Sequence, residues 1–144
     1  MISTIIVRGG IACWSNILTF LSDNLDPNQD TTIIENSIQA ITIIIEDSQE
    51  IMAESHQAKT VEYMMPKIFQ LIDPAQSEFV KDHAMFAINM LLMGEVSQVK
   101  QHAESYGLHL LKFNNDKAGK VKNRAIQGIT SVMECSYKFV IDNF

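Results

Sequence analysis

The sequence predicts an all-α fold in which pairs of helices stack side by side into a superhelix. Three observations lead to this prediction. A short segment recurs twice at nearly constant spacing, apolar residues recur every three or four positions, and only six glycines and three prolines occur in 144 residues. Because domain linkers are usually rich in glycine, serine or proline, and no such stretch is present, we expect one continuous array.

The recurring segment begins at Ile38, Met85 and Ile126, so its copies lie 47 and 41 residues apart. The copies have the sequences IQAITII, MFAINML and IQGITSV. A period of roughly 40–47 residues is typical of the two-helix HEAT or armadillo unit, which cannot bury its apolar side alone and must stack on neighbouring units. The sequence therefore predicts a HEAT-type solenoid of about three repeats.

The repeat spacing divides residues 1–144 into four parts of one HEAT-repeat segment. Two complete repeats are expected at 31–73 and 74–115, and partial repeats at 1–27 and 117–144. No polar capping repeat is visible at either end, and a solenoid needs such repeats for solubility. We expect either that the chain is a fragment of a longer array or that its ends pack on a partner.

The first helices are indicated by their apolar stripes and caps. Residues 1–7 have the pattern of the end of one helix, and 12–25 that of its partner. The next helix is expected over 32–53, because Thr32 and Glu35 form a capping box in which each side chain accepts from the other's backbone N–H.

The second helix of that repeat is expected over 58–72. Pro66 lies inside it and should bend it, because proline has no backbone N–H to donate. Directly afterwards, Asp73-Pro74 supplies a helix cap and a first-position proline. The sequence therefore predicts a new helix from this point to Met93, ended by Gly94.

The last part of the chain predicts two long helices, over 96–113 and 118–137, on the same apolar period. The polar sequence at 114–116 indicates the turn between them. Residues 138–144 have the pattern of the start of a further helix.

Composition excludes several classes of partner. With 11 basic and 17 acidic residues the net charge is −6, which argues against binding to the phosphate backbone of nucleic acids. No apolar run approaches the roughly 18 residues of a membrane span, and Met1–Val7 is too short for a signal peptide. Cys13 and Cys135 have no metal-binding or redox spacing, so we expect reduced thiols in an intracellular compartment.

The sequence contains no pattern for catalysis. There is no GxSxG motif, no cysteine with a convincing histidine partner and no phosphate-binding glycine loop. His102 and His109 supply two possible ligands without a third, which is too few for a zinc site. We expect no enzyme activity, no cofactor and no metal, and a small helical enzyme is the least supported alternative.

Consecutive motifs give the chain a more specific resemblance. Glu46–Ile51 (EDSQEI) is followed by Met64–Gln70 (MMPKIFQ), then by Lys81–Ala84 (KDHA) and Ala87–Asn89 (AIN). In order and spacing these motifs resemble HEAT repeats from the N-terminal half of the transportin (karyopherin-β2) branch of the importin-β superfamily. The resemblance covers nearly the whole chain.

The resemblance implies a segment of a nuclear import receptor found in the cytoplasm and the nucleus. Such receptors bind cargo proteins through nuclear localisation signals, contact nucleoporins and release cargo when Ran-GTP binds. The alternative from the repeat alone is a HEAT scaffold of another kind, such as a phosphatase scaffold or a cytoskeletal adaptor. That scaffold would share the architecture without binding Ran.

The resemblance also implies where partners would bind, because the second helix of each repeat lines the concave surface in this family. The polar or exposed positions of the two second helices are therefore candidate protein-binding residues: Lys59, Glu62, Tyr63, Gln70, Gln101, Glu104, Ser105 and Leu108. The alternative is that they form only the solvated sides of amphipathic helices.

Overall fold

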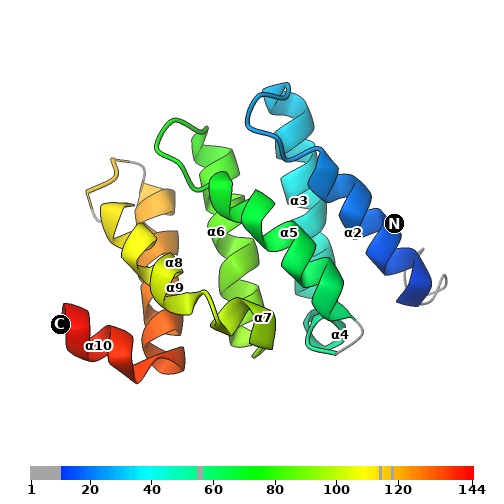
Figure 1. The fold of residues 1–144 in the computed structure, drawn as a ribbon. Coiled ribbons are helices and arrows are strands. Elements are labelled where there is room, and N and C mark those ends of the chain that lie inside the picture. The colour runs from blue at the N-terminus through cyan, green and yellow to red at the C-terminus, as the bar shows by residue number, and fades with distance from the viewer. Residues whose placement is uncertain (1–10, 55–56, 114, 118) are drawn as a thin grey trace.

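The computed structural model describes residues 11–54, 57–113, 115–117 and 119–144, and within these ranges the chain is helical and has no strand (Figure 1). The expected helix end at residues 1–7 lies outside the described residues. The helices are α2 (Ile11–Asp23), α3 (Thr31–Asp47), α4 (Gln49–Met52), α5 (Ala58–Gln70), α6 (Glu78–Met93), α7 (Ser97–Lys100), α8 (Ala103–Leu110), the 3-10 helix η2 (Leu111–Phe113), α9 (Gly119–Cys135) and α10 (Tyr137–Asn143).

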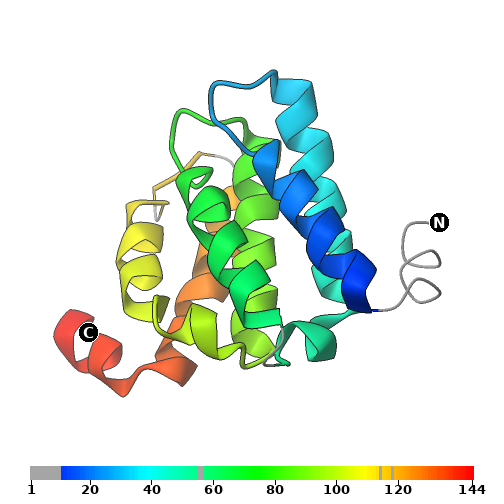
Figure 2. The same cartoon turned by 45° about the vertical axis from the view of Figure 1, so that its right-hand side comes forward.

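The long helices form two layers, as Figures 1 and 2 show from two directions. The first layer holds α3, α6 and α9, with α6 packed between the other two. The second layer holds α2, α5, α7 with α8, and α10, and α5 packs against α2 on one side and α7 on the other. The predicted HEAT-type solenoid segment is confirmed.

The three copies of the recurring segment occupy equivalent positions in α3, α6 and α9. Their central isoleucines, Ile41, Ile88 and Ile129, are all buried between the two layers. Because each isoleucine falls at the same position of its copy, the repeat in the sequence is also a repeat in the packing.

Equivalent polar residues also join neighbouring helices of the first layer. The Thr42 hydroxyl lies 3.5 Å from the carbonyl oxygen of His83, one repeat further along. At the equivalent place in the next repeat, the side-chain amide of Asn89 donates to the carbonyl oxygen of Arg124 at 3.2 Å. The Asn89 hydrogen bond joins α6 to α9, whereas the Thr42 hydroxyl donates within its own helix, to the Ile38 carbonyl at 2.7 Å.

The predicted capping box is wrong, because Asp30 caps α3. Its carboxylate accepts the backbone N–H of Thr32 at 2.8 Å, which leaves the Thr32 side chain no capping role. Glu35 accepts instead from the hydroxyl of Ser77 at 3.0 Å. The long helix also ends earlier than expected, at Asp47, and α4 follows as a separate short helix.

The helix predicted to begin at Pro74, after a cap at Asp73, begins four residues later, at Glu78. The Asp73 carboxylate accepts the N–H of Ala75 at 2.8 Å and forms a local turn. Ser77 is the actual cap of α6, since its hydroxyl accepts the N–H of Val80 at 3.2 Å. The predicted end of this helix at Gly94 is confirmed.

The single helix predicted over 96–113 is also wrong, because it is broken at Gln101 and His102. The first part, α7, packs against α5 and α6, whereas α8 packs against α9. One straight helix could not reach both surfaces. At this break the His102 N–H donates to the Val99 carbonyl three residues earlier, at 2.9 Å, which is the hydrogen-bond pattern of a tight 3-10 turn.

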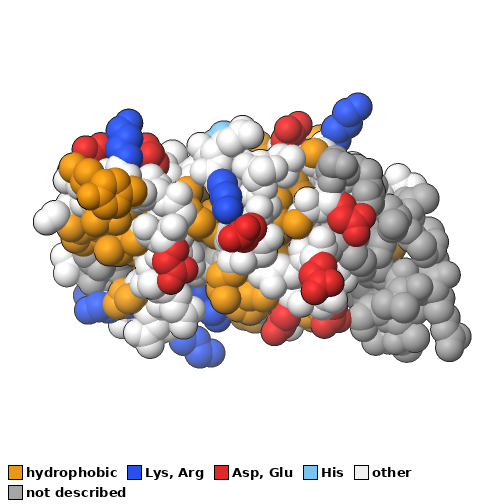
Figure 3. Space-filling model, turned by 90° about the horizontal axis from the view of Figure 1, so that it is seen from below, with side chains coloured by type: hydrophobic (Ala, Val, Ile, Leu, Met, Phe, Trp, Pro, Cys, Tyr) orange, Lys and Arg blue, Asp and Glu red, His pale blue; other side chains and the backbone are white. Residues whose placement is uncertain are grey.

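The surface seen in Figure 3 carries hydrophobic side chains near the C-terminal end. Tyr137, Ile141 and Phe144 are exposed there on and beside α10, at 79%, 63% and 73%.

No helix in the described ranges is both long and apolar enough to cross a membrane.

Candidate protein-binding surface

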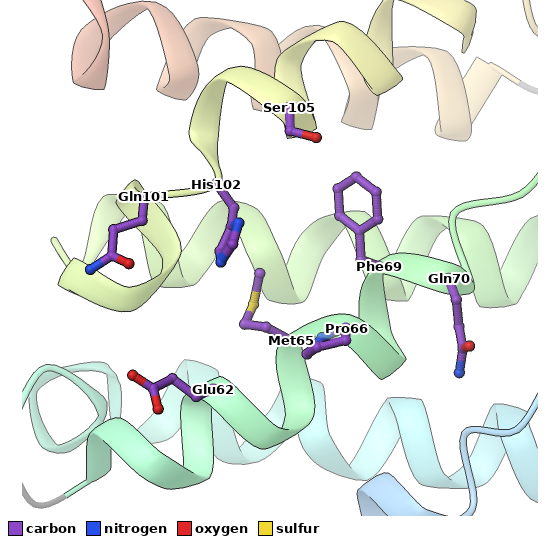
Figure 4. A pocket seen from close by; sticks show the side chains of 8 residues that line it. All are labelled: Glu62, Met65, Pro66, Phe69, Gln70, Gln101, His102 and Ser105. Carbon is purple, nitrogen blue, oxygen red and sulfur yellow. The ribbon is translucent and has the colours of Figure 1, made fainter.

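A groove runs between α5 and the α7–α8 pair on the second layer (Figure 4). Its volume of about 570 Å³ falls within the range of roughly 300–1,000 Å³ that is usual for ligand pockets. We call it the α5–α8 groove, and its lining residues are Glu62, Met65, Pro66, Phe69, Gln70, Gln101, His102 and Ser105.

Four of the eight candidate residues from the sequence come together in this groove. Glu62 and Gln70 lie along α5, Gln101 ends α7, and Ser105 lies in the first turn of α8. Whether any of them binds a partner stays a prediction.

The other four candidates lie outside the groove. Lys59 and Leu108 are exposed, Leu108 at 52%. Glu104 turns toward α10, where its carboxylate accepts from the Ser136 hydroxyl at 2.9 Å. Tyr63 lies on the side of α5 that faces α2.

Sequence reasoning missed the apolar residues of the groove and His102. In Figure 4 the side chains of Met65 and Phe69 extend from α5 toward α7 and α8. Met65 is 5% exposed, so it belongs both to the core and to the groove floor. The sequence could have placed Pro66 in the groove, because Pro66 lies one helical turn from both Glu62 and Gln70 and therefore on the same face of the helix.

Most polar side chains of the groove have no partner in the described part of the chain. Gln70 donates to the carbonyl of Leu25 at 3.1 Å. By contrast, Glu62, Gln101, His102 and Ser105 form no side-chain hydrogen bond or ion pair with any described residue. Their donors and acceptors are therefore available to a ligand.

Pro66 removes one backbone hydrogen bond from α5 beside the groove. Proline has no N–H, so it cannot donate to the carbonyl of Glu62 four residues earlier in α5. The Glu62 carbonyl thus lacks its usual helical donor, on a face where the Glu62 carboxylate is also exposed.

The side of α5 that faces α2 carries a polar cluster. The Lys67 ammonium donates to Asp23 at 2.6 Å and to the Tyr63 hydroxyl at 2.9 Å, and it lies 4.2 Å from the centre of the Tyr63 ring. The hydrogen bond from Lys67, followed by that from Tyr63, lowers the pKa of the Asp23 carboxyl. The cluster thus orients the helix that carries one wall of the groove.

Replacing Lys67 with methionine should return the pKa of Asp23 toward its ordinary value. The pKa rises because the largest cause of its lowering is removed, while the aliphatic stem remains. The lowered pKa stabilises the folded state above the unfolded pKa of Asp23, and this contribution is lost as the pH falls through the folded value. NMR titration of the Asp23 carboxyl carbon measures the change, and an unaltered titration in Lys67→Met would contradict the assignment.

The histidines and cysteine show no metal centre within the described residues, where no group of three histidine, cysteine or acidic side chains comes together. His102 lines the groove, whereas the His109 ring contacts the carbonyl of Ile72 and lies 5.1 Å from the Phe69 ring. Cys135 is a free, exposed thiol.

The architecture is that of a HEAT-repeat segment, and the groove lies between two neighbouring repeats. Transportin-1 from Mus musculus and from Homo sapiens are each 23% identical to the chain over 134 residues. Importin subunit beta-2 from Schizosaccharomyces pombe is 24% identical over 135 residues.

Each of these alignments covers 93% of the chain and 15% of the relative, so the chain spans about a seventh of the length of the curated relatives it matches. No protein-family model matches the chain. The similarities support an importin-β-like relationship for this HEAT-repeat segment.

Proposed function

We propose that this chain is a segment of a transportin-like nuclear import receptor and that it contributes part of a protein-binding surface. The observation that carries the proposal is the α5–α8 groove, which lies between consecutive repeats and presents unpartnered polar side chains beside an apolar floor. Similarity to transportins and importin subunit beta-2 along almost the whole chain supports the same role.

The partners that follow from this role are the GTPase Ran, nucleoporins and cargo proteins with nuclear localisation signals. Such a receptor moves between cytoplasm and nucleus. It carries out no chemical reaction, so its activity consists of differences in affinity between states of its partners.

The test is the affinity of the full-length protein for Ran loaded with GDP or with a non-hydrolysable GTP analogue. We expect the GTP form to bind at least about tenfold more tightly, within the usual range of coupling between two ligands. Surface plasmon resonance measures both dissociation constants. Equal affinities, or no binding, would contradict the import role and favour a HEAT scaffold that does not respond to Ran.

A further inference from the structure

The centre of the α5–α8 groove is a rigid apolar floor. Phe69 is held from behind by two rings, with centroids 6.2 Å away for Tyr106 and 5.1 Å away for His109. Met65 packs into the core beneath the groove, and Pro66 is exposed beside it. Because these side chains are already ordered, an apolar side chain that docks on them loses little of its affinity to ordering the site.

One end of the floor is acidic. Glu62 is exposed and forms no ion pair with any residue in the described ranges. Its backbone carbonyl has no helical donor at position 66, because proline has no N–H. Lys100, at the end of α7, is paired with Glu95 at 3.8 Å. An unpaired carboxylate in a chain of net charge −6 favours a cationic ligand.

Arginine suits this end better than lysine. A guanidinium presents five donors in a planar fork, so it can bond to a carboxylate through two parallel hydrogen bonds and still donate to a further acceptor. The Glu62 carboxylate supplies the two acceptors of such a pair.

The spacing along α5 fits an extended peptide. Glu62, Pro66 and Gln70 are separated by one helical turn each, or about 6 Å along the axis. Alternate side chains of an extended peptide are about 6.6 Å apart and point the same way. An extended peptide also leaves its backbone N–H and C=O groups free for Gln101 and Ser105, whereas a helical one uses them internally.

We propose that the α5–α8 groove binds an extended peptide of a partner protein in which an arginine is followed, two residues later, by a large apolar side chain. The arginine meets Glu62, and the apolar side chain lies on Met65, Pro66 and Phe69. This inference rests on the proposed function only in taking the chain to be a protein-binding segment.

The test is titration of the full-length protein into a fluorescein-labelled peptide, Gly-Ser-Arg-Ser-Leu-Ser-Gly, with binding followed by fluorescence anisotropy. We expect a dissociation constant on the order of 100 µM for so short a ligand. Two reference peptides, one with glutamate in place of arginine and one with serine in place of leucine, should bind at least about tenfold more weakly.

Matched variants assign the binding to the groove. Glu62→Gln keeps the shape of an exposed side chain and removes its charge, so it should weaken the arginine peptide about threefold to tenfold. Glu46→Gln makes the same change at an exposed position of α3, in the other layer, and should leave the affinity unchanged. Ser105→Trp fills the groove and should abolish binding.

Circular dichroism establishes that each variant is folded. Equal binding of the arginine and glutamate peptides, or equal effects of Glu62→Gln and Glu46→Gln, would overturn the inference. A Ran-GTP preference without arginine-dependent peptide binding would also overturn it while leaving the import role intact. Peptide binding that depends on Glu62, without any response to the nucleotide on Ran, would support the inference and remove the import role.

Discussion

Replacing Asn89 with alanine should lower the free energy of unfolding by about 3 kcal/mol, since it creates a cavity and removes two hydrogen bonds between helices. Asn89 is 3% exposed, in the middle of α6. Its side-chain oxygen accepts from the Tyr106 hydroxyl at 2.7 Å, and its amide donates to the Arg124 carbonyl at 3.2 Å. One side chain therefore joins α6 to both α8 and α9.

Tyr106 makes this loss severe because its hydroxyl has little else nearby. The ring is 1% exposed, and burial raises the pKa of Tyr106 well above its ordinary value, so the phenol stays protonated and continues to donate. After the substitution the hydroxyl keeps only the Met85 carbonyl, at 3.2 Å.

Urea denaturation followed by far-ultraviolet circular dichroism measures the effect. Asn36→Ala is the matched control, because Asn36 is exposed on α3 and its loss should change the unfolding free energy by no more than about 0.5 kcal/mol. If Asn89→Ala were as stable as Asn36→Ala, the hydrogen bonds between the repeats would not contribute to stability.

The layers could be predicted from the sequence because repetition and periodicity act together. Ile41, Ile88 and Ile129 recur at equivalent places, and a helical period assigns them to one side of each helix. Any stacked arrangement that buries these residues must place the three copies side by side. The recurring isoleucines therefore also predict the direction in which the helices stack.

Helix ends and breaks could not be predicted in the same way. Asp30 and Thr32 are both good caps, and which one is used depends on where the preceding loop enters. The break at Gln101 arises because α7 and α8 pack on different helices, although the apolar period continues through it. Local propensity does not encode such competition between distant surfaces.

The groove could be predicted only in part. The polar positions Glu62 and Ser105 followed from amphipathicity and from the family resemblance, because both lie on the outer side of second helices. The floor required the distance between α5 and α8, which a linear pattern does not contain. Met65 shows the difficulty, since an almost fully buried residue still lines the groove.

The packing of α9 on the other helices predicts that Gly128→Ala lowers the free energy of unfolding by about 1–3 kcal/mol. A methyl group at Gly128 would lie 2.5 Å from Leu110 Cδ1 and 2.6 Å from Asn89 Oδ1. Leu110 is fully buried, and Asn89 is held by Tyr106, so neither has free space to enter. The resulting strain exceeds the gain of about 1 kcal/mol that alanine brings to a helix interior.

Gly119→Ala in the same helix isolates this steric effect. Gly119 is exposed at the start of α9, and a methyl group there would meet nothing within 4 Å. We expect it to be neutral or to raise the free energy of unfolding by up to about 1 kcal/mol. In urea denaturation the free energy of unfolding should therefore fall in Gly128→Ala and stay the same or rise in Gly119→Ala. The reason is that, of the two glycines, only Gly128 lies where α6, α8 and α9 meet. If both variants were stabilised, the close approach of these three helices would not constrain position 128.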